Sequence, residues 1–424
     1  MESLFKSIDV EENPKRTFWV PVKDKSKKQL KKRRILKSTL NLLTAAGSYK
    51  QRTIVLTSSH LYYISSKNQV TKFTKINWKL LEAFQEPQNK KKCGFKLSNQ
   101  VAHQVFYTRN SKQQTKWVDA LSCLCINKGF ELEYQVLEKL GCGNFACVNL
   151  VREIKTSKIY AAKSVSKRVL RIENCEKNLL DEILAMKKLD HPSIPKLHKV
   201  YESYSEVHLI TDYVEGGTCL QRLYKKGPFS EESAAKLVYI LLETIDYMHS
   251  KNIAHRDIKA ENILMCASNN YEIKLIDFGL VCRSIHKGNT ERCGSPGYIA
   301  PEVLKGLKYG PKVDVFSTGI LLYILLSGIS PFGKLSVEKM LAANLKCDIK
   351  FPEELWGGIS MLGKDIVMQL TNPDPLKRPS ASEALQHPWF ELLVPPYFTL
   401  FLQNGFRTSF PGSPRTGSFE GYCL

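Results

Sequence analysis

The chain has 424 residues, of which 43% are hydrophobic and 24% are charged, and its formal net charge is +21 at pH 7. This length is too great for one compact core and suits a domain of about 120 residues followed by one of about 260. No apolar run approaches the ~20 residues that a transmembrane helix needs, and the first residues lack the apolar core of a secretory signal, which excludes those two classes and favours a cytoplasmic protein.

The positive charge is concentrated in the first third of the chain. Residues 1–129 hold 26 Lys and Arg against 8 Asp and Glu, a net of +18, whereas the remaining residues hold 36 against 33, a net of +3. An anionic partner should therefore contact the N-terminal third.

Residues 1–34 form a basic N-terminal segment. Nine basic residues lie between Lys23 and Lys37, with Asp24 as the one acid among them. At an anionic membrane surface such residues gain about 1 kcal/mol each. An import signal, a nucleic-acid contact or a solvated linker would look similar, although no aromatic interleaving supports nucleic acid. The preferred interpretation is peripheral contact with the cytoplasmic membrane face.

Residues 35–127 show several short strands followed by one helix. A hairpin is predicted from Lys50–Leu56 and Leu61–Ile64. Further strands are expected around 69–76, 94–98 and 101–107, and then a helix over Lys112–Cys125 with one face formed by Trp117, Leu121, Leu124 and Cys125. Strands that end in one Trp-bearing helix resemble the pleckstrin-homology (PH) family. That resemblance implies a partly open β-barrel with a C-terminal helix.

In the PH family, a pair of basic residues at the start of the second strand grips phosphoinositide head groups, and Lys50 and Arg52 match that pair. The basic residue expected on the preceding strand has no match, because Leu42, Leu43 and Thr44 occupy that region. Lys50 and Arg52 are thus lipid-binding candidates, and a protein-contact role is the alternative.

After a very short connection near 126–133, residues 134–390 carry motifs for phosphate chemistry. The sequence LGCGNFACV contains Gly141 and Gly143, which would let backbone N–H groups approach a phosphate closely, and Ala146 stands where a third glycine would be. Alone, this segment could equally be an ordinary hairpin turn. Lys163 follows in YAAK, and Glu182 lies on a helix predicted over 178–189.

Two further motifs supply carboxylates at the spacing of one active site. The run HRDIKAEN contains Asp257, Lys259 and Asn262, and DFG follows a strand-like run and contains Asp277. A carboxylate can orient a hydroxyl, and carboxylate and amide oxygens can hold Mg²⁺.

In this order the motifs resemble those of the eukaryotic protein kinases, and Lys259 is typical of the serine/threonine branch. The sequences CGSPGYIAPEV and HPWF resemble the calcium/calmodulin-dependent kinase group. The resemblance implies an α+β fold class in which a PH-like β-barrel precedes a two-lobed kinase, with ATP and Mg²⁺ as cofactors and proteins as substrates. A lipid-targeted adaptor or pseudokinase scaffold is the alternative.

The resemblance also implies roles for individual residues. Lys163, steadied by Glu182, would contact the α- and β-phosphates. Asp257 would orient the acceptor hydroxyl, and Lys259 would steady the γ-phosphate. Mg²⁺ would bind Asn262 and Asp277. The adenine would lie among Leu140, Val148, Ala161 and Leu264 and against backbone groups of Asp212 and Val214. Thr211 would be a small gatekeeper with a relatively open pocket behind it. Glu302 and Arg378 would form a structural pair.

An activation switch is predicted in the same way. In many relatives a phosphothreonine four residues before the Ser/Thr of the GT/S-P element pairs with the HRD arginine, which is Arg256 here. Counting back four from Ser295 reaches Glu291, a carboxylate that would pair with Arg256 without phosphorylation. The alternative is that Thr290 is the phosphosite.

Residues 391–424 form a tail with several prolines, which we expect to be extended and docked through Phe398, Phe401 or Phe406. The tail shows no basic amphipathic helix of the calmodulin-binding kind, and the chain shows no EF-hand loop.

The twelve cysteines include no CxxC pair, so we expect reduced thiols. Cys142, Cys147 and Cys282 are candidate redox switches, against the alternative of small tolerated side chains.

Overall fold

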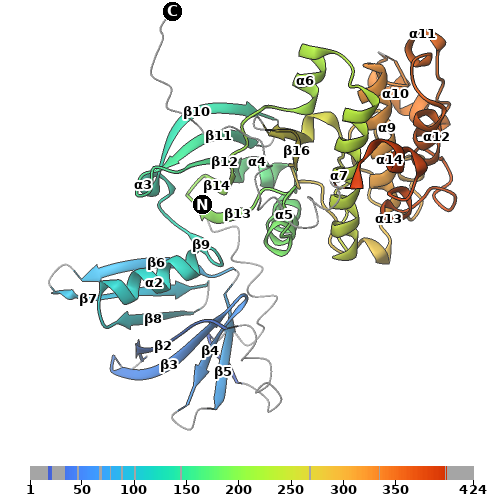
Figure 1. Ribbon diagram of the computed structural model, residues 1–424. Coiled ribbons are helices and arrows are strands. Elements are labelled where there is room, and N and C mark those ends of the chain that lie inside the picture. The colour runs from blue at the N-terminus through green and yellow to red at the C-terminus, as the bar shows by residue number, and fades with distance from the viewer. Residues whose placement is uncertain are drawn as a thin grey trace, which may run out of the picture. The chain divides into compact units, whose positions relative to one another are not determined.

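The computed structural model describes residues 18–21, 34–44, 47–65, 69–76, 78–86, 89–99, 102–143, 146–266, 269–333, 335–396 and 398. The chain forms two compact units, of which unit 1 comprises 1–183 with 196–213 and unit 2 comprises 184–195 with 214–424. Figure 1 shows unit 1 as mostly strands and unit 2 as mostly helices. No helix in the described ranges is long and apolar enough to cross a bilayer.

The N-terminal part of unit 1 is a strand-rich segment that ends in one helix. Its elements are β1 (Val20–Pro21), β2 (Arg34–Leu43), β3 (Tyr49–Thr57), β4 (His60–Ile64), β5 (Val70–Lys75), β6 (Leu80–Glu86), β7 (Asn89–Ser98), β8 (His103–Thr108) and α2 (Ser111–Ser122). The predicted hairpin and helix are confirmed. Strand β6 was missed because its sequence LLEAFQE contains Glu and Ala, which are depleted in strands.

The core of this segment lies where strands and helix meet. Alternation along β3 turns Ile54 and Leu56 inward, and both are fully buried. Trp117 of α2 is fully buried as well, stacks on Phe95 at 5.8 Å between ring centroids, and donates from Nε1 to Ser38 Oγ at 2.9 Å. The indole therefore buries its apolar body and also satisfies its one donor.

The described strands form an open sheet, and the partly open barrel that the PH resemblance implied is not confirmed. In the N-terminal segment the strand order is β1-β5-β4-β3-β2-β8-β7-β6. Strand β6 pairs with β7 on one side and with β9 (Ile126–Asn127) on the other, so it does not return to the β1 edge.

The short connection predicted near 126–133 contributes one strand, β9, to the sheet. Strand β9 is parallel to β6 and also to β13 (Leu197–Glu202). The buried Asn127 side chain donates from Nδ2 to Ser122 O at 2.8 Å and to Val200 O at 3.1 Å. In α3 (Phe130–Glu133), Phe130 stacks on His208 at 4.2 Å. The connection is therefore fixed to the strands on both sides of it.

The rest of unit 1 presents the predicted glycine-rich hairpin and the helix that follows it. The elements are β10 (Tyr134–Cys142), β11 (Ala146–Glu153), β12 (Ile159–Ser166), α4 (Lys167–Ile172), α5 (Glu176–Lys188) and β14 (Glu206–Asp212). The predicted apolar face of α5 is confirmed, because Leu179, Ile183, Met186 and Leu189 are all buried. Helix α5 continues from unit 1 into unit 2 at residue 184.

Unit 2 is built around two long helices, α7 (Glu231–Ser250) and α9 (Lys312–Ser327). Ser230 caps α7 by accepting from the backbone of Ser233, and α9 is buried along most of its length. The other elements are α6 (Cys219–Lys226), η1 (Ala260–Asn262), β15 (Ile263–Cys266), β16 (Asn269–Leu275), η2 (Ile285–Lys287), α8 (Pro301–Leu304), α10 (Val337–Lys346), α11 (Glu353–Trp356), α12 (Met361–Leu370), α13 (Ala381–Ala384) and α14 (Pro388–Leu393).

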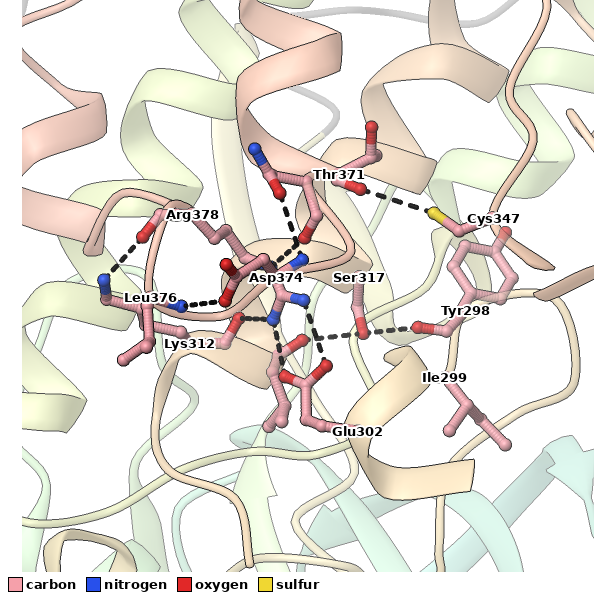
Figure 2. Close-up of polar contacts among 12 residues, drawn as sticks. Tyr298, Ile299, Glu302, Lys312, Ser317, Cys347, Thr371, Asp374, Leu376 and Arg378 are labelled. Atoms are coloured by element: carbon pink, nitrogen blue, oxygen red, sulfur yellow. Dashed lines mark hydrogen bonds and ion pairs between the residues drawn. The ribbon is translucent and has the colours of Figure 1, made fainter. Parts of the chain in front are cut away.

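A buried ion pair braces unit 2. Arg378 donates from Nη1 to Glu302 Oε1 at 2.7 Å and from Nη2 to Glu302 Oε2 at 3.0 Å (Figure 2). Further bonds from Arg378 to the carbonyls of Asn372 and Lys312 use two more of its five donors. The predicted structural pair is confirmed. Its several hydrogen bonds compensate the loss of hydration that both charges suffer when they are buried.

The tail, expected to be extended from residue 391, begins instead in α14, which continues to Leu393, and a buried aromatic residue follows. Phe398 is 3% exposed, and Lys236 Nζ of α7 lies 5.9 Å from its ring centroid. This agrees with the predicted docking of the tail, whereas Phe401 and Phe406 lie outside the described residues.

Candidate active site

The lysine–glutamate pair lies in unit 1. Lys163 of β12 donates from Nζ to Glu182 Oε1 of α5 at 2.6 Å. The Glu182 side chain is 5% exposed and that of Lys163 is 22% exposed, so the pair is largely shielded. Glu182 rather than Asp181 is the partner, as the sequence predicted.

The register of the sheet gathers the predicted nucleotide residues of unit 1 on one face. Val148 on β11 lies opposite Lys163, and Ala161 lies opposite Thr211 on β14. Ala161 and Lys163 are two apart on one strand, so all four side chains share a face. Asp212 ends β14 and accepts, through its carboxylate, from the backbone N–H of Lys196 at 2.9 Å. This bond fixes the start of the predicted hinge.

The glycine-rich hairpin is open to solvent. Leu140, Gly141 and Gly143 are exposed, and a Cβ at either glycine would meet no atom closer than 4.0 Å. The Gly143 N–H donates to Ala146 O at 2.9 Å and closes the turn. Nothing therefore crowds the backbone that would approach a phosphate.

The expectation that all thiols are reduced is wrong for one pair. Cys142 and Cys147 are joined by a disulfide across the hairpin, with Cα atoms 4.1 Å apart. The cause is the register, which places these two residues directly opposite each other on β10 and β11. Cys282, in contrast, is free and buried.

The carboxylate of Asp257, predicted to be catalytic, lies in unit 2 within a set of hydrogen-bond donors. The nearly buried Asp257 accepts from Lys259 Nζ at 2.9 Å, from Asn262 Nδ2 at 3.0 Å and from Ser295 Oγ at 2.7 Å. Lys259 Nζ also donates to Ser295 Oγ at 2.6 Å. Two predicted residues, Lys259 and Asn262, therefore donate to the carboxylate of a third, Asp257.

Ser295 is a residue that the sequence did not assign to the site. In the sequence, Ser295 of Gly294-Ser295-Pro296 only marks the position from which Glu291 lies four residues back. The hydroxyl of Ser295 is bonded to Asp257 where the hydroxyl of an acceptor could bind. The bond therefore indicates how Asp257 could accept a hydrogen bond from an acceptor hydroxyl.

Asp314 holds the loop that carries Asp257. Its carboxylate accepts from the backbone N–H groups of His255 and Arg256 at 2.9 and 2.7 Å and lies 2.9 Å from His249 Nε2. Burial alone would raise the pKa of Asp314, but these hydrogen bonds and the charge of His249 lower it, so the carboxylate stays ionised. Burial lowers the pKa of His255, which keeps that imidazole neutral.

The predicted metal donors are adjacent in unit 2. The Ile276 N–H donates to Asn262 O at 2.9 Å, which ties the loop of Asn262 to the residue before Asp277. Asp277 is exposed and has φ 63°, a left-handed conformation that is costly outside glycine and is found at functional sites. One carboxylate and one amide oxygen fit Mg²⁺, which takes few protein ligands and completes its shell with phosphates and water. Leu264 and Val214, predicted around the adenine, are half-buried in the same unit.

The predicted switch pair is formed. Arg256 Nη1 donates to Glu291 Oε2 at 2.8 Å and to Tyr309 Oη at 3.1 Å, and its Nε donates to Leu280 O at 2.6 Å. Tyr309 Oη in turn donates to the Glu291 carbonyl at 2.6 Å. Thr290 is exposed. The geometry therefore favours Glu291 over Thr290 as the group that engages Arg256.

The lipid candidates lie at one end of β3. Lys50 is exposed opposite Leu42, and Arg52 lies over the Tyr63 ring with its Cζ 5.5 Å from the centroid. The basic residues from Lys23 to Arg33 lie outside the described residues.

Comparisons with known proteins agree with the geometry. The family described as the protein kinase domain matches residues 134–390. Myosin light chain kinase A of Dictyostelium discoideum is 38% identical over 263 residues, which cover 61% of this chain and 88% of that protein. Human calcium/calmodulin-dependent protein kinase type IV is 37% identical over 276 residues, which cover 64% of this chain and 56% of that protein.

Mouse serine/threonine-protein kinase DCLK3 is 38% identical over 273 residues, which cover 63% of this chain but only 34% of that protein. The similarity is therefore carried by the catalytic segment, whatever else each relative contains. Together with the matched family, it shows that the chain belongs to the protein kinase family and is a protein serine/threonine kinase that uses Mg-ATP.

Proposed function

We propose that this kinase is catalytically active and uses the residues that the sequence singled out. The observation that carries the proposal is the Asp257 carboxylate, which accepts hydrogen bonds from Lys259 and Asn262. When bound, Mg-ATP supplies the γ-phosphoryl group and the cation that offsets its charge. Asn262 and Asp277 would hold that cation.

The chain's own residues position the reactants. Lys163, fixed by Glu182, presents one positive charge to the nucleotide phosphates. Asp257 orients the acceptor hydroxyl in the place now taken by Ser295 Oγ, and Lys259 is adjacent to balance charge on the γ-phosphate. Because phosphoryl transfer needs mainly positioning and electrostatics, this set is sufficient for the chemistry and argues against a pure scaffold.

Matched acceptor peptides test this proposal. Three peptides that differ only in having Ser, Thr or Tyr as the acceptor are incubated with the full chain and Mg-ATP. Transfer to the Ser and Thr peptides is expected, because the bond from Ser295 Oγ to Asp257 at 2.7 Å shows that an aliphatic hydroxyl can approach this carboxylate. Transfer to the Tyr peptide alone, or to none of several peptide sets, would contradict the assignment of roles.

The proposal includes a built-in activating charge. Glu291 supplies the negative group that orders the segment through Arg256, so phosphatase treatment of the purified chain should leave its activity in place. Glu291→Ala should lower kcat roughly three- to ten-fold, a modest effect because the carboxylate is 54% exposed and solvent weakens the pair. Thr290→Ala is the matched control and should change little. Silencing of the native enzyme by phosphatase would disprove the built-in switch.

We further propose that residues 35–127 form a PH-like module that brings the kinase to the cytoplasmic face of an anionic membrane. The strand sequence β2 to β8 followed by α2 supports it, as does the net charge of +18 in residues 1–129. Lys50 and Arg52 are the candidate contacts for phosphoinositide head groups. A protein-contact role for the same module is the second candidate.

Vesicle sedimentation tests the targeting proposal. The full chain should sediment with phosphatidylserine vesicles at low salt and less completely as the salt concentration rises, because charges are screened over about 8 Å at physiological ionic strength. Replacing Lys50 and Arg52 with Ala should reduce the preference for phosphoinositide vesicles, whereas replacing Lys27, Lys28 and Lys31 should weaken binding to all anionic vesicles. Failure to sediment with any anionic vesicle at low salt would favour the protein-contact role.

A further inference from the structure

We propose that Cys142 and Cys147 are a reversible oxidation site that regulates the glycine-rich hairpin. The two residues are joined in the structure and lie directly opposite each other on β10 and β11, with Cα atoms 4.1 Å apart. Pairs whose Cα atoms are more than about 7 Å apart cannot be bridged without backbone movement, and this pair lies inside that limit. The hairpin therefore keeps the two sulfurs within bonding reach whether they are oxidised or reduced.

The bond lies on the face of the hairpin away from the nucleotide residues. Side chains alternate along a strand, so Cys147 and its neighbour Val148 project to opposite faces. Val148 shares its face with Ala161 and Lys163, the residues expected to contact ATP. The disulfide on the outer face therefore leaves the nucleotide side of the hairpin clear.

Solvent reagents can reach this pair more easily than most other described cysteines. Cys142 is exposed and Cys147 is half-buried. Burial raises the pKa of Cys219 to about 12 and that of Cys347 to about 11, which keeps those thiols protonated and slow to react. Cys123 is exposed and free, but its Sγ donates to Asp119 O and no disulfide involves it. Cys123 is therefore the matched control for a surface thiol.

The chemistry needs a peroxide as the oxidant and a dithiol as the reductant. The Cys142 thiolate attacks one oxygen of hydrogen peroxide, forms a sulfenic acid and releases hydroxide, which takes up the thiol proton as water. The Cys147 thiol then attacks the Cys142 sulfur, so that the S–S bond forms, the S–O bond breaks, and the hydroxyl leaves with the thiol proton as a second water. A dithiol reverses the bond by two thiol–disulfide exchanges and is itself oxidised to a disulfide.

Oxidation should restrain a hairpin that has to move during turnover. In the described residues, the Gly143 N–H to Ala146 O bond at 2.9 Å closes the turn, and the space around Gly141 and Gly143 is open. Glycine-rich loops of kinases close over the nucleotide and reopen to release product, and such motions often limit kcat. A covalent tie between the two ends of the turn limits this movement. The oxidised enzyme should therefore have a lower kcat.

Peptide mass tests the oxidation site independently of kinase activity. The full chain is treated with dithiothreitol or with hydrogen peroxide, its free thiols are alkylated, and it is digested with trypsin. Both cysteines lie in one tryptic peptide, Leu140–Arg152. After peroxide this peptide should carry no alkyl group and weigh about 2 Da less than the unmodified dithiol, because two hydrogens are lost. Two alkylated cysteines after peroxide would overturn the site.

The regulatory role rests on the kinase activity and has its own readout. The kcat of the native chain should fall several-fold after peroxide and recover after dithiothreitol. Each of Cys142→Ser and Cys147→Ser, compared with its own untreated sample, should be insensitive to peroxide, and Cys123→Ala should remain as sensitive as the native chain. Cys147→Ser should also accumulate a sulfenic acid at Cys142 that a cyclic 1,3-dione traps. If peptide mass showed the disulfide but the kcat of the full chain did not change, the regulatory role would be overturned and the oxidation site would stand.

Discussion

Replacing Asp257 with asparagine is expected to lower kcat by about 10²–10⁴-fold, the usual range when a positioned acid–base group is removed. The amide has the same shape but cannot take the acceptor proton, and its –NH₂ group would face the donors that now surround the carboxylate. Lys259 and Ser295 both donate toward this position, at 2.9 and 2.7 Å. ATP binding should be retained, and steady-state assays with fluorescence-monitored nucleotide binding would separate the two quantities.

Ser295→Ala is the matched control for this change. It removes one neutral hydrogen bond to Asp257 and leaves the carboxylate in place, so the loss should be less than about ten-fold. If Asp257→Asn and Ser295→Ala had the same small effect, Asp257 would not be the group that orients the acceptor.

Lys163→Met is expected to lower kcat/KM by at least about 10²-fold, because it removes a preorganised positive charge from the phosphate site. The change also leaves Glu182 without the lysine to which it is bonded at 2.6 Å, in a place where its side chain is only 5% exposed. An uncompensated buried carboxylate should destabilise unit 1, and thermal unfolding would show a lower Tm.

The double variant Lys163→Met with Glu182→Gln separates stability from catalysis. The neutral amide removes the unpaired charge, so the double variant should regain much of the Tm that the single variant lost. Its kcat/KM should stay as low as that of Lys163→Met, because the phosphate contact is still missing. A double variant that regained activity together with Tm would show that Lys163 acts through stability alone.

Local chemistry explains why so much of the site could be predicted. Glu182 follows from its place on one face of α5, and the pairing of Arg256 with Glu291 follows from a count along the chain. Each of these motifs is defined by a few residues at a fixed spacing along the chain, so it can be recognised in the sequence alone. The apolar faces of α2 and α5 were predicted for the same reason, since periodicity is a local property.

The features that escaped prediction depend on contacts between distant segments. The bond from Ser295 to Asp257 spans 38 residues, and the parallel pairing of β9 with β6 and β13 joins three separate parts of unit 1. The disulfide needed the register of β10 against β11, in which two cysteines five residues apart face each other. Composition led to the opposite expectation, because scattered cysteines without CxxC pairs are usually reduced.

Transfer of labelled γ-phosphate tests the central claim most directly. The full chain and Asp277→Ala are each incubated with Mg²⁺, labelled ATP and a mixed protein substrate, and the labelled product is hydrolysed to its phosphoamino acids. The native chain should yield phosphoserine and phosphothreonine, and Asp277→Ala should yield neither, because it lacks the carboxylate that holds the cation. Equal label from both proteins, or none from the native chain at any Mg-ATP concentration, would contradict an active kinase with this site.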